Sequence, residues 1–298
     1  MIRSMLLHAF QIALLIVCSL PARAADVRLT SFDGICSRAV VDIAGEIKIG
    51  DAIKVQKVLE KIGERSKKEF CGLEPFVRVS SPGGSVDEAM KIGRLLKKYS
   101  ADLIVPLDAE CLSACVFLIS GGVKRGLVDA GRVGIHRPYF REMSQGLSVT
   151  DVSKIRSSIV SSYKTYFEEM DINPALVDEM LATPPDEIKY LSGDQLKLYR
   201  LAVDDANYEE SETARNAAFY GLTSSDYRSR KATATAACNV RSKEYTACHL
   251  SFLLDIPIRE ARRRIDLADV RCQHRLDPDP LTDHRKTLLC MRSVYGLK

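Results

Sequence analysis

Two cysteines flank a single serine in the segment Cys111-Leu112-Ser113-Ala114-Cys115, which lies just before an apolar run. The free N–H groups at the start of a helix can bind a capping serine hydroxyl, and they also favour negative charge. This serine is therefore either a helix cap or a nucleophile held on a sharp turn. Serine hydrolysis also needs a base within hydrogen-bond reach and N–H donors for the oxyanion. The nucleophile interpretation therefore requires a base and donors elsewhere in the chain.

The chain has one candidate for each of these parts. His136, in "VGIHRPYF", is the only histidine between residues 25 and 205. Gly83 and Gly84, in "SSPGGSV", follow an expected strand, and paired glycines let the backbone turn and expose an N–H group. Taken singly, each residue has an ordinary structural interpretation: His136 as a structural histidine, the two glycines as a strand-to-helix turn and Ser113 as a helix cap. In combination they predict hydrolysis through a serine nucleophile.

The elements that must position these residues follow from the hydrophobic pattern. Short apolar runs alternate with amphipathic segments from Ala39 to about Ala202, which predicts an α/β fold with parallel strands and right-handed crossover helices. We expect strands over 39–45, 75–81, 102–108 and 132–138, and helices over 50–68, 85–100, 113–122 and 150–170.

From about Val40 to Val203 the chain resembles the ClpP-like serine peptidases of the ClpP/crotonase fold, and most of all the exported ClpP-like proteins of bacterial envelopes. The resemblance rests on "DIAGEI", "SSPGGSVDEAMKI", "CLSACVFLISGG", "GIHRP" and "YLSGDQLKLYRLAVD" in this order. It covers about 164 of 298 residues, with a step of 29 residues from Gly84 to Ser113. It implies that Ser113 is the nucleophile and His136 the general base, with the N–H groups of Gly84 and Ala114 forming the oxyanion hole.

The third member of the catalytic group is where the sequence departs from the family. The position of the family's aspartate is occupied by Ile188. Asp186 and Glu187 lie one or two residues away, and either carboxylate could orient His136. A Ser–His pair would also work, since the third group orients and stabilises the histidine rather than reacting.

The first 24 residues predict a cleaved signal peptide. A basic start at Arg3, an apolar run over 9–20 and the small residues Ala22 and Ala24 have the order of such a signal. The apolar run is shorter than the ~20 residues needed to span a bilayer. We therefore expect cleavage after Ala24 and a periplasmic or secreted protein.

Cleavage removes one of nine cysteines, and the even set of eight that remains is typical of disulfides in an oxidising compartment. A Cys111–Cys115 disulfide would clamp the turn that presents Ser113; the alternative is two small buried side chains. The cysteine–histidine segments of the tail lack the paired short spacings of zinc sites, so we expect no metal. Sequence proximity favours pairing Cys36 with Cys71, Cys111 with Cys115, and Cys238, Cys248, Cys272 and Cys290 among themselves.

The remaining expectations concern domains and partners. We expect a ClpP-like domain over 25–205 and a helical, disulfide-linked extension over 206–298. The formal charge of +4 gives no support for nucleic-acid binding. The expected activity is peptide or unfolded-protein hydrolysis without a cofactor or an ATPase partner, by a homo-oligomer. The alternatives are a catalytically inactive binding or scaffold protein, and a crotonase-like enzyme acting on acyl thioesters.

Overall fold

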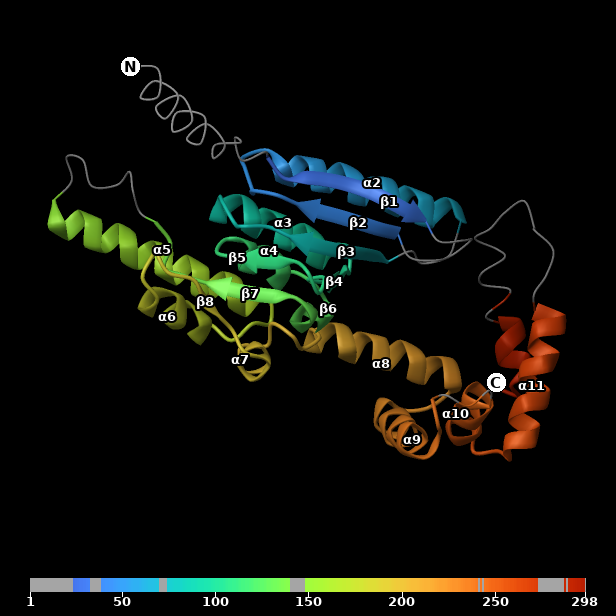
Figure 1. The fold of residues 1–298 in the computed structure, drawn as a ribbon. Coiled ribbons are helices and arrows are strands. Elements are labelled where there is room, and N and C mark those ends of the chain that lie inside the picture. Colours follow the sequence, from blue (N-terminus) through green and yellow to red (C-terminus); the bar gives the residue numbers. More distant parts are fainter. Residues whose placement is uncertain are drawn as a thin grey trace, which may run out of the picture.

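The computed structural model describes residues 24–32, 39–69, 74–139, 148–240, 242, 244–272, 287 and 289–297. Within them, two sheets and a set of helices form an α/β body, and further helices follow at its C-terminal end (Figure 1). The larger sheet has the strand order β1 (Asp26–Phe32), β2 (Ala39–Ala44), β3 (Pro75–Ser80), β4 (Asp102–Ile104) and β6 (Lys124–Leu127). The smaller sheet has the order β5 (Glu110–Leu112), β7 (Arg132–Ile135) and β8 (Lys189–Tyr190).

The strand pairing is parallel in the middle of the molecule and antiparallel at one edge of each sheet. β2, β3, β4 and β6 pair in parallel, as do β5 and β7, whereas β1 and β8 each pair antiparallel with their single neighbour. The parallel pairing expected for the core strands is therefore confirmed, whereas β1 and β8, which were not among the expected strands, pair antiparallel. Only residues 33–38 separate β1 from β2, too few for the crossover that a parallel pair requires.

The helices of the body are α2 (Asp51–Glu69), α3 (Val86–Lys98), α4 (Cys115–Ser120), α5 (Val149–Glu169), α6 (Ala175–Ala182) and α7 (Gly193–Leu198), with a short 3-10 helix at Val128–Ala130. The helix expected over 113–122 is shorter than predicted, because Ser113 has a positive φ of 56° and cannot continue a right-handed helix. All residues of α4 are buried.

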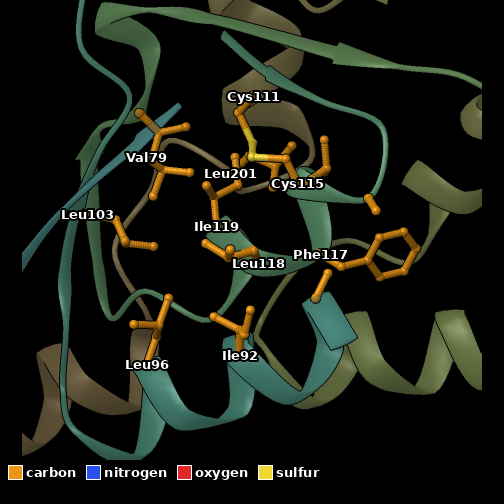
Figure 2. Close-up of a cluster of buried hydrophobic side chains, with 14 of the residues drawn as sticks. Val79, Ile92, Leu96, Leu103, Cys111, Cys115, Phe117, Leu118, Ile119 and Leu201 are labelled. Carbon is orange, nitrogen blue, oxygen red and sulfur yellow. A yellow bond between two sulfur atoms is a disulfide. The ribbon is translucent and has the colours of Figure 1, made fainter. Parts of the chain in front are cut away.

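The position of α4 is fixed by glycines and aromatic rings. A Cβ on Gly121 would lie 2.0 Å from the carbonyl oxygen of Gly93 in α3, so only hydrogen atoms fit where the two helices cross. On the other side, Phe117 stacks on Phe167 with ring centroids 4.7 Å apart. The Tyr166 hydroxyl donates to the Phe117 carbonyl at 2.6 Å. Figure 2 shows the packing of α4 against Ile92 and Leu96 of α3 and Val79 and Leu103 of the sheet.

Arg125 is a fully buried cation that fastens the end of α4 to later parts of the chain. It donates to the carbonyls of Gly122 at 2.5 Å, Met170 at 3.3 Å and Val203 at 2.9 Å. Its Nη2 has no hydrogen-bond partner among the described residues and lies 3.9 Å from the Asp171 carboxylate. Burial lowers the pKa of Arg125 to about 10, although the nearby carboxylates oppose the shift.

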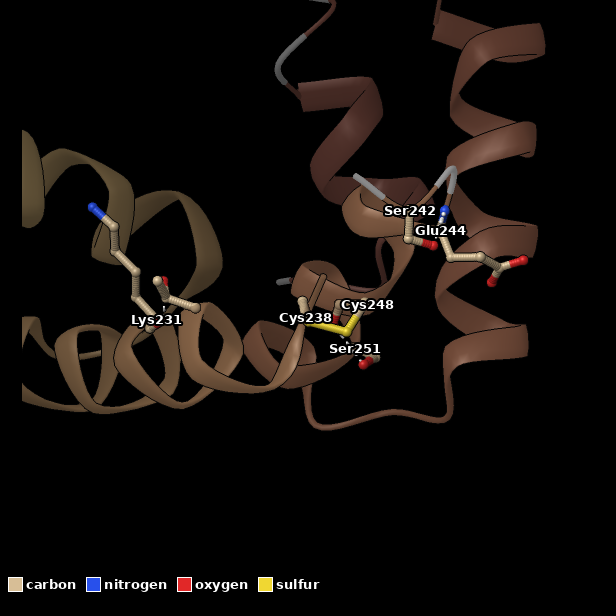
Figure 3. Close-up of a disulfide and its surroundings, with 7 residues drawn as sticks. Lys231, Cys238, Ser242, Glu244, Cys248 and Ser251 are labelled. Atoms are coloured by element: carbon tan, nitrogen blue, oxygen red, sulfur yellow. Dashed lines mark hydrogen bonds between the residues drawn. A yellow bond between two sulfur atoms is a disulfide. The ribbon is translucent and has the colours of Figure 1, made fainter. Parts of the chain in front are cut away.

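The C-terminal part is helical and cross-linked. It contains α8 (Ala206–Tyr220), α9 (Ser224–Ala237), α10 (Tyr245–Leu254) and α11 (Ile258–Cys272); α9 packs beside the far half of α8, and α11 lies beyond that end (Figure 1). A disulfide between Cys238 and Cys248 joins the end of α9 to α10 (Figure 3). A second disulfide joins Cys272 to Cys290. Cys36 and Cys71 lie outside the described residues, and within those residues no helix is long and apolar enough to cross a membrane.

Candidate active site

Ser113 occupies a tight turn between β5 and α4. Its N–H group donates to the carbonyl of Gly134 at 2.9 Å, and its own carbonyl accepts from the N–H of Val116 at 3.1 Å. These two bonds hold the half-buried serine at a φ of 56°, a left-handed conformation that few residues other than glycine adopt. These backbone hydrogen bonds therefore fix the conformation of Ser113, and the residue is not part of the helix that follows.

A disulfide links the two sides of the turn. Cys111 in β5 and Cys115 at the start of α4 are bonded, with their Cα atoms 5.2 Å apart. Both cysteines are fully buried, and Figure 2 shows their sulfur atoms on the core side of the turn near Leu201. Ser113 lies between the two bonded cysteines in the sequence, so the disulfide restricts the conformations available to the turn.

The glycine-containing loop packs directly against this turn. Ser81 bridges β5, since its N–H donates to Glu110 at 2.8 Å and its carbonyl accepts from Leu112 at 2.9 Å. Gly83 follows with a φ of 101°. A Cβ at Gly83 would lie 2.7 Å from the Cβ of Ser113, so a side chain there would displace the serine.

Two backbone N–H groups beside Ser113 are left for a ligand. The carbonyl of Gly83 accepts from Ile47 at 2.7 Å, and the N–H of Ser85 donates to Ile47 at 2.9 Å. These bonds fix both sides of Gly84, which has a φ of 135°. Within the described part of the chain, the N–H groups of Gly84 and Ala114 have no acceptor. They can therefore donate to a negative oxygen that forms next to the Ser113 hydroxyl.

His136 follows β7, the strand next to β5. Leu112 pairs with Gly134, so Ser113 and His136 emerge at the carboxyl ends of adjacent parallel strands. The Nδ1 atom of His136 lies 2.9 Å from the carbonyl oxygen of Arg137. A carbonyl only accepts hydrogen bonds, so Nδ1 carries the proton and Nε2 is left as the acceptor. This is the tautomer that a general base requires.

The serine and histidine side chains are not hydrogen-bonded to each other in the described part of the chain. Catalytic hydrogen bonds often tighten only when substrate binds. The structure thus places the two predicted residues at the carboxyl ends of neighbouring strands.

The place of an orienting acid is filled by an apolar side chain. β8 runs antiparallel to β7 with Ile135 opposite Lys189, and continuing this register puts Ile188 opposite His136. The Cγ2 atom of Ile188 covers Gly134, since a Cβ there would lie 2.6 Å away. Asp186 and Glu187 are exposed, and neither carboxylate is hydrogen-bonded to His136 among the described residues.

No family model matches the chain. No curated protein matches it either. Among solved structures, the chain is similar to a mutant of the 1510-N membrane-bound stomatin-specific protease, with 17% identity and a TM-score of 0.42. The match covers 58% of this chain and 82% of that chain. A likeness at this level establishes neither the family nor the function.

A groove lies along the amino ends of β5 and β7, and neither Ser113 nor His136 lines it. It has a volume of about 550 Å³, and its walls include Pro82, which precedes the two glycines, and Leu112, which precedes Ser113. On its rim, Arg132 forms an ion pair with Glu110, and the Tyr190 hydroxyl donates to the same carboxylate at 2.9 Å. Its lining residues are Ser80, Ser81, Pro82, Leu107, Asp108, Glu110, Leu112 and Arg132.

Two groups that support this site were missed in the sequence. The Arg137 carbonyl on His136 is a backbone atom, so no residue pattern reveals it. Ile47 holds the glycine loop through both of its backbone groups, and its position in "DIAGEI" gave no indication of that contact. A hydroxyl, an imidazole with its proton on Nδ1 and two backbone N–H donors together suit acyl transfer.

Proposed function

We propose that the chain is an exported serine hydrolase of the ClpP/crotonase type, acting as an ATP-independent peptidase. The observation that carries this proposal is the packing of the Gly83–Gly84 loop against the Ser113 turn, with the N–H groups of Gly84 and Ala114 free to bind an oxyanion. A capping serine alone needs no second N–H donor from a separate loop. Two N–H groups that are unpaired among the described residues, one from this loop and one from the residue after Ser113, support acyl-transfer chemistry.

The reaction follows from these groups. The Ser113 Oγ attacks the carbonyl carbon of a peptide bond while Nε2 of His136 takes the hydroxyl proton. The negative oxygen of the tetrahedral intermediate accepts from Gly84 and Ala114. The C–N bond then breaks, and His136 returns the proton to the leaving amine. Water, activated by the same histidine, releases the acyl group from Ser113.

The setting of the reaction is part of the proposal. Residues 1–24 are the signal peptide, 25–205 the catalytic domain and 206–298 a helical extension. Outside the cytoplasm there is no ATP to drive an unfolding motor, so the substrates are flexible or unfolded peptide chains. The working form is a homo-oligomer.

The test is covalent labelling with a fluorophosphonate, which reacts with activated serines. We expect the purified, oxidised wild type to be labelled and Ser113→Ala to be unlabelled. The matched control is Ser161→Ala, which changes an exposed serine of α5 and should leave labelling intact. Labelling that survives in Ser113→Ala would place the reactive group elsewhere and contradict the proposal.

A catalytically inactive binding protein is the second candidate. Ile188, opposite His136, favours it because the position that would carry an orienting carboxylate is apolar. A folded wild type that is not labelled, and that binds an unfolded peptide without cleaving it, would support this candidate over a hydrolase.

A further inference from the structure

Asp51 is a buried carboxylate outside the candidate active site. It is the first residue of α2, and only 1% of its surface is exposed. Its Oδ2 accepts from the N–H of Lys48 at 2.8 Å, and its Oδ1 lies 2.7 Å from Nζ of Lys54. A buried charge is costly unless its partners replace the water that it loses.

The remaining partner of this carboxylate is the backbone nitrogen of Ala25. It lies 3.3 Å from Oδ2 of Asp51, and Ala25 is only 2% exposed. The Ala25 carbonyl accepts from Nζ of Lys54 at 3.4 Å, so Ala25 and Asp51 share that cation. Ala24, directly before it, is exposed. The chain therefore passes from the surface to a buried carboxylate at the Ala24–Ala25 peptide bond.

This bond is also where the sequence predicts signal cleavage. We propose that Ala25 is the N-terminal residue of the mature protein and that its ammonium group forms a buried ion pair with Asp51. Water hydrolyses the Ala24–Ala25 bond, leaving a carboxylate on Ala24 and an amino group on Ala25. An α-amino group has an ordinary pKa of about 8, so it is protonated at neutral pH.

The charges around Asp51 suit an added cation. A second buried acid, Glu88 of α3, lies at the same end of α2 and accepts from the N–H groups of Gly50 and Ala52 at 2.9 Å each. The lysines that pair with these acids, Lys54 and Lys91, keep 50% and 62% of their side chains exposed. The amino group of Ala25 would be the buried cation among two buried acids.

The ion pair would also reach the glycine loop, a consequence that rests on the proposed function. Asp51 fixes Lys48 through its N–H group, and the neighbouring residue, Ile47, binds Gly83 and Ser85. Signal removal would thereby stabilise the segment that holds Gly84 beside Ser113.

The first experiment measures the intact mass of the full chain after export from a bacterial cell. We expect a loss of residues 1–24 and an N-terminal Ala25. A glycine inserted between Ala24 and Ala25 then moves the ammonium group away from Asp51 after processing. We expect this insertion to lower the Tm by about 5 °C or more in the wild type and by little in Asp51→Asn. Asp26→Asn, which removes a half-exposed neighbouring carboxylate, is the matched control and should keep the full effect.

A mature N-terminus at another residue, or an equal loss of Tm in the wild type and Asp51→Asn, would overturn the proposal. If Asp51→Asn does not fold, acetylation of amines mapped by mass spectrometry gives the answer. The Ala25 amino group should react at least about tenfold more slowly than that of the glycine-inserted protein, because it is buried and paired. Equal rates would contradict the proposal. None of these readouts needs activity, so they fail independently of the proposed hydrolysis.

Discussion

At the scale of the residue, the histidine is oriented by a carbonyl where a triad has a carboxylate. The Arg137 carbonyl fixes the proton on Nδ1 of His136, but a neutral oxygen stabilises an imidazolium less than a carboxylate does. The register of β7 and β8 ends at the Ile135–Lys189 pair, and Ile188 and His136 are the next residues on the two segments. The site is therefore a Ser–His pair in which, among the described residues, a backbone carbonyl and no carboxylate contacts Nδ1 of the imidazole.

Ile188→Asp tests this description by adding a carboxylate opposite His136. We expect the rate of fluorophosphonate labelling to rise about tenfold, since the charge stabilises the imidazolium. Ile188→Asn introduces a side chain of nearly the same shape as aspartate but without its charge. It should give a much smaller increase in the labelling rate. Equal rates for the two variants would show that a charge at this position does not act on His136.

The two carboxylates expected from the sequence give a complementary prediction. Asp186 and Glu187 are exposed and do not bond to His136 among the described residues. We expect Asp186→Asn and Glu187→Gln to label within about twofold of the wild type, because exposed charges are screened by water. A loss of about a hundredfold in either variant would identify that carboxylate as the orienting group.

At the scale of the element, Glu88 connects α3 to the start of α2. Burial raises the pKa of Glu88, but the N–H groups of Ala52 and Gly50 and the ammonium of Lys91 outweigh it, so its pKa lies below the ordinary value. A depressed pKa means that the folded state favours the ionised form. The stabilisation is complete above the unfolded pKa of about 4.3 and is lost as the pH falls through the folded pKa.

Glu88→Gln should therefore lower the free energy of unfolding at pH 7 by about 1–3 kcal/mol. Urea unfolding at a series of pH values measures the difference between the variant and the wild type. We expect it to shrink as the pH falls below about 4, where the wild-type carboxyl also becomes neutral. A difference that is the same at pH 7 and pH 3 would show that the charge of Glu88 contributes nothing.

The disulfide in the Ser113 turn is an element-scale constraint with its own test. Replacing both Cys111 and Cys115 by alanine should lower the free energy of unfolding by about 2 kcal/mol, given the short loop that they close. We expect labelling of Ser113 to slow at least about tenfold because the turn is no longer clamped. The matched control replaces Cys238 and Cys248, whose disulfide joins α9 to α10 away from the turn, and should leave the labelling rate unchanged. Equal rates in the two double variants would contradict a role for the clamp.

At the scale of the whole molecule, the regular pattern of the parallel core could be read from the sequence. β2, β3, β4, β7 and α3 fall within the expected segments, and α2 and α5 match theirs to within one residue, because each has a clear apolar period. Four of the described strands were missed. β5, β6 and β8 are two to four residues long, too short to show alternation, whereas β1 has seven residues and lies before the first expected strand. Their places are set by tertiary pairing, which no local pattern specifies.

The candidate site shows the same division. Ser113, His136 and the two glycines stand out because their residue types are unusual for their places in the chain. The groups that orient them are the Arg137 carbonyl, the backbone of Ile47 and the side chain that covers Gly134, and these depend on contacts between segments distant in sequence. The nucleophile and base were therefore predictable as candidates, whereas their supporting contacts were not.

A crystal structure of the fluorophosphonate adduct tests both the nucleophile and the oxyanion hole. We expect a covalent bond from the Ser113 Oγ to phosphorus, with the phosphonyl oxygen about 2.7–3.1 Å from the backbone nitrogens of both Gly84 and Ala114. An adduct on another residue, or a phosphonyl oxygen that turns away from these two N–H groups, would contradict this expectation.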